Sequence, residues 1–306
     1  MQGSLTFTIA LAALLSAAEA PYRTEVDEWR QRQEQELKAD GGWLSVTGLF
    51  WLKEGVNSAG SAASNGIVLP RGPAQLGAFD FRDGQITFRP APGAAVSLNG
   101  KAAAAASRLK TDTGGKPDQI GLDGLTLFVI HRGDRYGIRL KDMDSKLRKD
   151  FAGRHWFPVQ PAYRVTAKFV AYDPPKLIAV PNVLGETSQM PSPGYVQFSL
   201  GGQLLRLDPV VEEDSLFFIF HDATSGKGTY PPGRFLHADF AKDGKVTLDF
   251  NKAYNPPCVF THYATCPLPP PENRLDLVIT AGEKAYRGAV HHDAAPVAGA
   301  KAGKAS

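Results

Sequence analysis

Polar residues of the types that bind and activate small molecules gather toward the end of the sequence, between residues 222 and 283. In β proteins such side chains normally point outward from loops, where they need no special explanation. Here they stand beside Pro-Pro and Pro-Leu-Pro-Pro segments, and proline restricts the backbone, which lowers the entropy lost when several side chains are held together. A rigid polar loop region is a good candidate for a binding site. The residues that we assign to ligand binding are Lys227, Arg234, Asn251, Tyr254, Asn255 and Arg274.

The cations in this group indicate what the ligand would be. Arg234 and Arg274, together with Lys227 in a glycine-flanked turn, favour a carboxylate or a phosphate, because a planar guanidinium binds such oxygens in pairs. The asparagine amides and the Tyr254 hydroxyl would then orient the rest of the molecule. We therefore expect a small anionic ligand. The alternative is an interior polar network that only fixes loops to the sheet.

A hydrolase is the second functional class, and its candidate bases are the carboxylates of Asp222 and Glu283. A nucleophile is harder to assign, because Ser225 lacks the Gly-x-Ser-x-Gly elbow. A nucleotide loop is absent as well, since His221 stands where such a loop needs its first glycine. The sequence predicts no cofactor. A structural envelope protein without a ligand is the third class.

Cys258 and Cys266 are the only cysteines, and they flank a short proline-rich segment. In an oxidising compartment a pair this close most simply forms a disulfide, which would contribute about 2–3 kcal/mol to stability. His262 lies between them, and thiolate and imidazole are ligands of zinc. However, only three ligands are local and the paired spacing of zinc sites is missing, so we expect no metal. A reduced Cys266 could act as a nucleophile, which a disulfide would prevent.

The composition excludes nucleic acid as a partner and indicates a folded, mainly β chain. The chain has 306 residues, and 34 Lys+Arg against 31 Asp+Glu leave a formal net charge of +3. This is too little for a nucleic-acid groove, so we expect no nucleic acid. Hydrophobic residues at 43% and charged residues at 21% are typical of a folded chain. The high content of glycine (31) and proline (23) favours many short strands over long helices.

The N-terminus has the layout of an export signal. Residues 5–15 are apolar apart from two threonines, and small residues follow at 16–18, although no Lys or Arg precedes them. We predict a signal peptide over residues 1–18. The alternative, a membrane anchor, is too short, because about fourteen apolar residues reach about 21 Å as a helix and a bilayer core needs about 30 Å. We expect a periplasmic or extracellular protein with no membrane association after cleavage.

The remaining pattern predicts a mainly β fold. Residues 19–42 form an amphipathic helix, with an apolar stripe of Tyr22, Val26, Trp29 and Leu37. From residue 43 onward, short runs rich in Val, Ile, Phe and Leu alternate with turn residues, as in sandwiches and barrels. The clearest hairpin is 79–88, which turns at Asp83-Gly84. A low-complexity patch places the seam between two β domains near Gly115, so we predict domains over 43–115 and 116–284 and a flexible tail over 285–306.

Aromatic clusters occur at 155–158 and at Trp43 with Trp51. We expect them to pack in the core, and stacking on a sugar or a base is the alternative.

The segment 60–100 resembles a forkhead-associated (FHA) β-sandwich. The resemblance is carried by the spacing of 60–69, the hairpin 79–88 and 96–100. Ser61 stands where that family places an arginine, and no Ser-x-x-His occurs in 73–77. The resemblance therefore implies a small sandwich without phosphothreonine recognition.

A second resemblance covers nearly the whole chain after the export signal. It is to the bacterial family catalogued as DUF1684, and it rests on the strings at 42–52, 181–186, 222–227, 229–230, 233–236, 249–251, 253–258, 263–270, 272–274 and 281–284. In that family the position of His262 is usually not histidine. The strand pattern over residues 116–284 predicts a larger antiparallel β domain with long proline-rich loops. The resemblance implies family membership and no particular activity.

Overall fold

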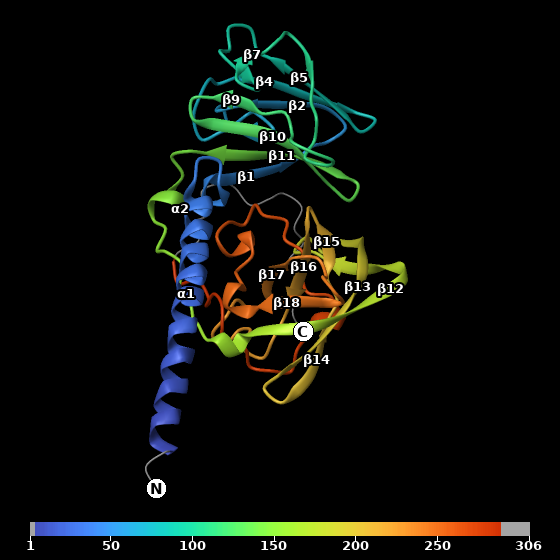
Figure 1. Ribbon diagram of the computed structural model, residues 1–306. Coiled ribbons are helices and arrows are strands. Elements are labelled where there is room, and N and C mark those ends of the chain that lie inside the picture. The colour runs from blue at the N-terminus through green and yellow to red at the C-terminus, as the bar shows by residue number, and fades with distance from the viewer. Residues whose placement is uncertain (1–3, 289–306) are drawn as a thin grey trace. The chain divides into compact units, whose positions relative to one another are not determined.

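The computed structural model describes the backbone of residues 4–288 and the side chains from residue 20 onward. The described chain forms two compact units (Figure 1). Unit 1 contains residues 4–37, 152–259 and 265–288, and unit 2 contains residues 38–151 and 260–264. Strands dominate both units and pair mostly antiparallel, which confirms the mainly β fold with an N-terminal helix.

Unit 2 is built from two sheets. The six-stranded sheet has the order β1-β11-β10-β9-β6-β7, with strands β1 Val46–Trp51, β6 Ser97–Leu98, β7 Lys101–Ala102, β9 Ile120–Leu122, β10 Leu125–Arg132 and β11 Arg135–Asp142. The five-stranded sheet has the order β3-β2-β4-β5-β8, with strands β2 Gly55–Gly60, β3 Ile67–Val68, β4 Gly77–Arg82, β5 Gln85–Pro90 and β8 Ser107–Arg108. The short helices are η1 Trp43–Ser45 and α2 Lys146–Lys149.

The two sheets of unit 2 pack face to face. Phe79 and Phe88 from one sheet share a buried cluster with Leu127 and Ile138 from the other. Period-two alternation supplies the apolar face of β5, where Ile86 and Phe88 are buried. The predicted hairpin is confirmed, because β4 pairs with β5 through a turn in which Asp83 and Gly84 both adopt positive φ.

The expected domain seam near Gly115 is not where the units divide. β9 follows this segment and pairs with β6, while β11 pairs with β1. Residues 116–151 therefore belong to the same sandwich as residues 43–115, and the division falls after residue 151. The polar, alanine-rich composition that suggested a seam marks exposed connections within one β unit.

Unit 1 contains a four-stranded sheet, β14-β13-β12-β18, and a three-stranded sheet, β15-β16-β17. Their strands are β12 Arg164–Pro181, β13 Thr187–Leu200, β14 Gln203–Leu207, β15 Val210–Glu212, β16 Ser215–Phe220, β17 Arg234–Ala238 and β18 Lys245–Asp249. Residues from both sheets, among them Phe198, Phe218, Leu236 and Leu248, form one buried core. The short helices are η2 Pro161–Tyr163, η3 Phe250–Lys252, η4 Pro257–Val259 and η5 Pro271–Asn273.

The N-terminal helix α1 spans Ser4–Lys38. It therefore begins before residue 19, the predicted start, and ends before residue 42, the predicted end. Gly41, with a positive φ, follows the helix. Its Val26 and Leu37 are buried, and the Tyr22 hydroxyl donates to Asp249 at 2.8 Å. Of the predicted signal peptide, residues 1–3 lie outside the described residues, as do residues 289–306 of the predicted tail. Among the described helices, none is long and apolar enough to span a bilayer.

Candidate functional site

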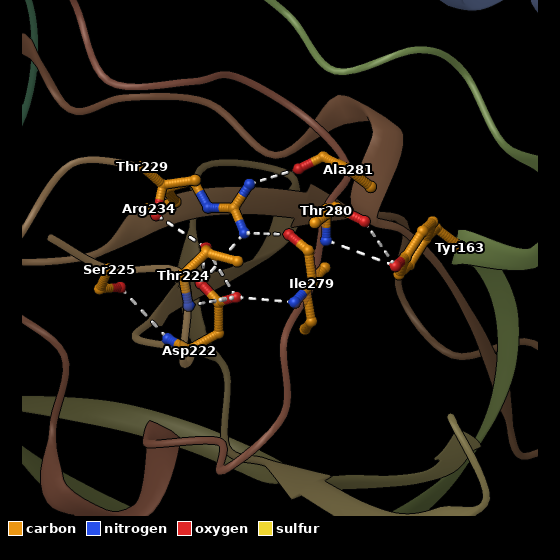
Figure 2. Close-up of polar contacts among 9 residues, drawn as sticks. All are labelled: Tyr163, Asp222, Thr224, Ser225, Thr229, Arg234, Ile279, Thr280 and Ala281. Carbon is orange, nitrogen blue, oxygen red and sulfur yellow. Dashed lines mark hydrogen bonds and ion pairs between the residues drawn. The ribbon is translucent and has the colours of Figure 1, made fainter. Parts of the chain in front are cut away.

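Arg234, the centre of the predicted anion site, is completely buried on the core side of β17. Its guanidinium donates to Asp222 and to the backbone oxygen of Ile279, both at 3.1 Å, and also to the backbone oxygen of Ala281. Figure 2 shows the guanidinium held between these groups. Burial lowers the pKa of Arg234, and the neighbouring carboxylate of Asp222 opposes that change.

The Asp222 carboxylate is equally engaged. It accepts from the Thr224 hydroxyl at 2.8 Å and from the Ile279 backbone N–H at 2.9 Å, in addition to Arg234 (Figure 2). The Thr224 hydroxyl in turn lies 2.9 Å from that of Thr229. These hydrogen bonds tie the guanidinium and the carboxylate to each other and to the chain. The geometry therefore does not support Arg234 as a ligand-binding residue or Asp222 as a general base.

The other predicted cations lie in a different environment. Lys227 is exposed in the turn after β16, and Arg274 is exposed at the end of η5. The backbone of Arg274 forms a bridge with His221, and burial together with the charge of Arg274 lowers the pKa of that histidine. One predicted arginine thus lies in the core and the other at the surface, so they do not form a joint clamp for an anion.

Asn251 is also fully buried and acts within the fold. Its Nδ2 donates to the Tyr22 hydroxyl at 2.9 Å and to the Gln160 oxygen at 2.8 Å, and its Oδ1 accepts from the Gln160 N–H at 2.9 Å. These bonds fix helix α1 and the segment before η2 to η3. Asn251 is therefore a positioning residue for the helix.

Tyr254, Asn255 and Glu283, in contrast, come together with two residues that the sequence did not single out as ligands. The buried Glu283 carboxylate accepts from both Nε and Nη2 of Arg154 and from the Asn255 backbone N–H at 2.8 Å. The Arg154 guanidinium lies 4.9 Å from the ring centre of Trp156 and 5.9 Å from that of Tyr254. The Asn255 Nδ2 donates to the Lys284 backbone oxygen.

Aromatic rings continue from this pair as a row. Trp156 lies 5.8 Å from Trp29 and Trp29 lies 6.3 Å from Tyr254, both edge to face. Tyr254 is stacked at 13° on His237, which is stacked at 19° on Phe217. Both tryptophans and Tyr254 are partly exposed and 37% of the His237 side chain is exposed, so the row reaches the surface and most of the imidazole is still covered. We call Trp29, Arg154, Trp156, His237 and Tyr254 the Tyr254 cluster.

A chain of polar atoms runs along the outer end of the cluster. The Tyr254 hydroxyl lies 3.0 Å from His237 Nε2, and His237 Nδ1 lies 3.0 Å from the Ser215 hydroxyl. Glu212 Oε2 is 3.7 Å from His237 Nε2. Burial lowers the pKa of His237, while burial and the Glu212 charge raise the pKa of Tyr254. At neutral pH the imidazole and the phenol are therefore both uncharged and available as hydrogen-bond partners.

The predicted cysteine pair is bonded, because Cys258 and Cys266 form a disulfide with a Cα–Cα distance of 6.2 Å. Among the described residues, no group of three or more His, Cys, Asp or Glu side chains could hold a metal ion.

A hollow of about 550 Å³ lies in unit 2, next to β6, β7, β9 and β10. Small residues dominate its wall, which includes Ser97, Gly121 and Thr126. None of the predicted binding residues lines it. It therefore does not support the predicted pocket among residues 222–283.

The fold and this site define a mainly β protein with an aromatic, partly exposed polar cluster in unit 1. Residues 149–284 match the model of the family described as "Protein of unknown function (DUF1684)", which supports the family that the sequence strings indicate. No protein of curated function matches the chain. Among solved structures, the chain is similar to the solution NMR structure of an uncharacterized protein of Haloarcula marismortui. The two are 33% identical over 45% of this chain and 78% of that chain, with a TM-score of 0.38.

Proposed function

We propose that the protein is an exported small-molecule-binding module and that the Tyr254 cluster is its binding surface. The observation that carries this proposal is the row of partly exposed rings ending in the Tyr254 hydroxyl and the His237 imidazole. Aromatic faces supply contact area for a ligand ring or a methylated ammonium, and the polar tips supply orientation. The Arg154–Glu283 ion pair lies beneath the rings and holds them in place.

The carboxylates at the outer end of the cluster favour a cation over the anion expected from the sequence, because the guanidiniums of Arg30 and Arg154, which both lie 4.9 Å from the ring centre of Trp156, are bonded within the fold. The Arg154 guanidinium is already bound to Glu283, and Arg234 is already bound to Asp222. The carboxylates of Glu212 and Glu36 both raise the pKa of Tyr254, and both residues are exposed. A small organic cation on an aromatic face gains about 0.5–2 kcal/mol from the ring, and nearby carboxylates add attraction. We infer that the ligand is a small organic cation.

The test is calorimetric titration of the purified protein with tetramethylammonium chloride and choline chloride, with sodium acetate as the anionic probe. Saturable heat with the cations, absent with acetate, is the expected result. Tyr254→Ala should abolish this heat. The matched control, Tyr195→Ala, removes a partly exposed tyrosine that stacks on Arg206 elsewhere in unit 1 and should leave the heat unchanged. Equal binding in both variants would overturn the proposed surface.

The export part of the proposal is supported by the apolar segment at 5–15 and the small residues that follow it. In a Gram-negative host, the mature chain is expected in the periplasm and its mass should correspond to a start at Glu19. Leu14→Arg places a charge in the apolar segment and should retain the uncleaved chain in the cytoplasm. Uncleaved wild-type chain in the periplasm would contradict the predicted signal peptide.

A hydrolase with Asp222 or Glu283 as its base is not proposed. Both carboxylates are buried in ion pairs with arginine, so neither faces a substrate. A purely structural role is the outcome if the protein neither binds a ligand nor catalyses a reaction.

The sandwich of unit 2 is proposed to be FHA-like in architecture. Supporting observations are its facing six-stranded and five-stranded sheets. Because the sequence lacks the residues with which FHA domains bind phosphothreonine, no phosphopeptide binding is proposed. A solved structure of unit 2 compared with FHA domains strand by strand tests this, and a different strand order would contradict it.

A further inference from the structure

Glu212, Ser215 and His237 share one face of the sheet β15-β16-β17. Ser215 begins β16 two residues before Phe217, which pairs with His237 of β17, and Glu212 pairs with Ser215 at the end of β15. Because side chains alternate between faces along a strand, Ser215 and Phe217 lie on the same face. The turn between Glu212 and Ser215 contains only Glu213, at φ 48°, and Asp214. The positions of these side chains are therefore fixed by strand register and a tight turn.

The contacts run from a potential nucleophile, Ser215, to a potential base, His237, and on to Tyr254, which orients that base. The Ser215 hydroxyl is 3.0 Å from His237 Nδ1, and the opposite ring nitrogen, Nε2, is 3.0 Å from the Tyr254 hydroxyl. With the proton on Nε2, the ring donates to Tyr254 and leaves Nδ1 free to accept from Ser215. The serine hydroxyl also lies 3.1 Å from the Glu212 backbone oxygen, so its proton has a second acceptor. The arrangement matches the general requirement for an activated hydroxyl, which is a base within hydrogen-bond reach and a third group that orients that base.

We propose that Ser215 and His237 act as nucleophile and base in the hydrolysis of carboxylic esters at this surface. The activity goes beyond the binding of a cation and does not require it, because the reacting groups lie at the outer end of the row. Both side chains are accessible to a substrate from solvent, because Ser215 is partly exposed and His237 is exposed.

The reaction balances with water as the only co-reactant. Ser215 Oγ bonds to the acyl carbon while its proton passes to His237 Nδ1. The bond between the acyl carbon and the alcohol oxygen then breaks, and that oxygen takes the proton from Nδ1. Water next attacks the acyl carbon and gives a proton to Nδ1, and the bond to Ser215 Oγ breaks as Oγ recovers that proton. The products are a carboxylic acid, an alcohol and the unchanged protein.

Glu212 and Tyr254 would stabilise the imidazolium that forms in each half of this cycle. Glu212 Oε2 is 3.7 Å from Nε2 and the Tyr254 oxygen is 3.0 Å from it, so a carboxylate and a hydroxyl face the nitrogen that becomes positive. Glu213 is the other charged group that acts on the ring. General base assistance of this kind is worth about 10²- to 10⁴-fold in rate.

The experiment combines covalent labelling with hydrolysis. The full-length protein is incubated with a fluorophosphonate probe, digested, and the labelled peptide is sequenced by mass spectrometry, while p-nitrophenyl acetate hydrolysis is followed in parallel. One adduct at Ser215 and a measurable rate are expected. Ser215→Ala should reduce both to background, and His237→Gln should lower the rate by about 10²- to 10⁴-fold.

Ser199→Ala is the matched control, since Ser199 is an exposed strand serine of β13 in the same unit, and it should leave both readouts unchanged. Ser215→Cys retains a nucleophile at the same place and should react with iodoacetamide faster than Ser199→Cys does. The wild-type labelling result stands even if a variant fails to fold. An unlabelled Ser215 in the folded wild-type protein, or hydrolysis that persists in Ser215→Ala, would overturn the proposal. Because p-nitrophenyl acetate is uncharged, this result is independent of cation binding.

Discussion

Arg234 and Asp222 form an ion pair that is almost entirely removed from solvent, with 3.1 Å between Nη2 and Oδ1. The pair joins the start of β17 to the segment that follows β16, and its remaining hydrogen bonds hold the chain at Ile279 and Ala281 (Figure 2). The residues that a sequence pattern most readily assigns to ligand binding thus connect strands to the C-terminal segment of unit 1.

Asp222→Asn should destabilise unit 1 strongly. Removing one partner leaves a buried guanidinium without its counter-charge, which typically costs about 3–5 kcal/mol. Urea denaturation followed by circular dichroism measures the loss. Arg274→Ala, at an exposed arginine of the same sequence region, should change stability by less than about 0.5 kcal/mol. Equal effects of the two substitutions would contradict the structural role of the ion pair.

Tyr22→Phe should loosen helix α1 from the rest of unit 1. The Tyr22 hydroxyl donates to Asp249 and accepts from Asn251, and burial and the Asp249 charge raise its pKa. Losing these bonds should lower the free energy of unfolding by about 1–2 kcal/mol. The loosening of α1 is measured by hydrogen exchange of its amides, which should become faster, while exchange of the β10 amides in unit 2 serves as the control. Unchanged exchange in α1 would show that this contact does not hold the helix.

Reduction of the Cys258–Cys266 disulfide should weaken unit 1 moderately. The bond closes a loop with a sequence separation of 8, for which chain entropy predicts about 2–3 kcal/mol. Urea midpoints with and without dithiothreitol give the difference. A chain with both Cys258→Ala and Cys266→Ala should no longer respond to dithiothreitol, and a response in that variant would point to another origin.

Stability should rise with pH in the acidic range because of His237. Burial lowers its pKa in the folded state below the ordinary value of 6.5, so the unfolded chain binds more protons just below pH 6.5. The free energy of unfolding therefore increases as the pH rises toward 6.5 and levels off above it. His221 has a lowered pKa as well and contributes in the same direction. Urea midpoints at pH 5 and pH 7 should differ less in His237→Gln than in the wild type, and an equal difference would contradict this assignment.

Local features of the fold follow from the sequence, because they depend on neighbouring residues. The hairpin at Asp83-Gly84 is set by turn chemistry, and the Cys258–Cys266 bond by a short separation. The polar contacts that hold unit 1 together depend on pairs far apart in the chain: Arg154 reaches Glu283 across 129 positions, and Tyr22 reaches Asp249 across 227. No local pattern encodes such pairs.

The misassignment of Arg234 has a specific cause. Exposed arginines bind anions and buried ones pair with carboxylates, and the residue type alone does not distinguish the two. The strand pattern contained a signal, because Arg234 and Leu236 alternate with Phe235 and His237, which places the arginine on the same side as a core leucine.

Binding of a small organic cation at the Tyr254 cluster is measured most directly by the shift of tryptophan indole N–H signals in NMR spectra during titration with tetramethylammonium. The chain has four tryptophans. Trp29 and Trp156 lie in the cluster, whereas Trp43 and Trp51 belong to unit 2 and serve as internal controls. Saturable shifts of the Trp29 and Trp156 signals, lost in Tyr254→Ala, are predicted. No saturable shift of the Trp29 and Trp156 signals, or an equal shift of all four, would show that the cluster does not bind the cation.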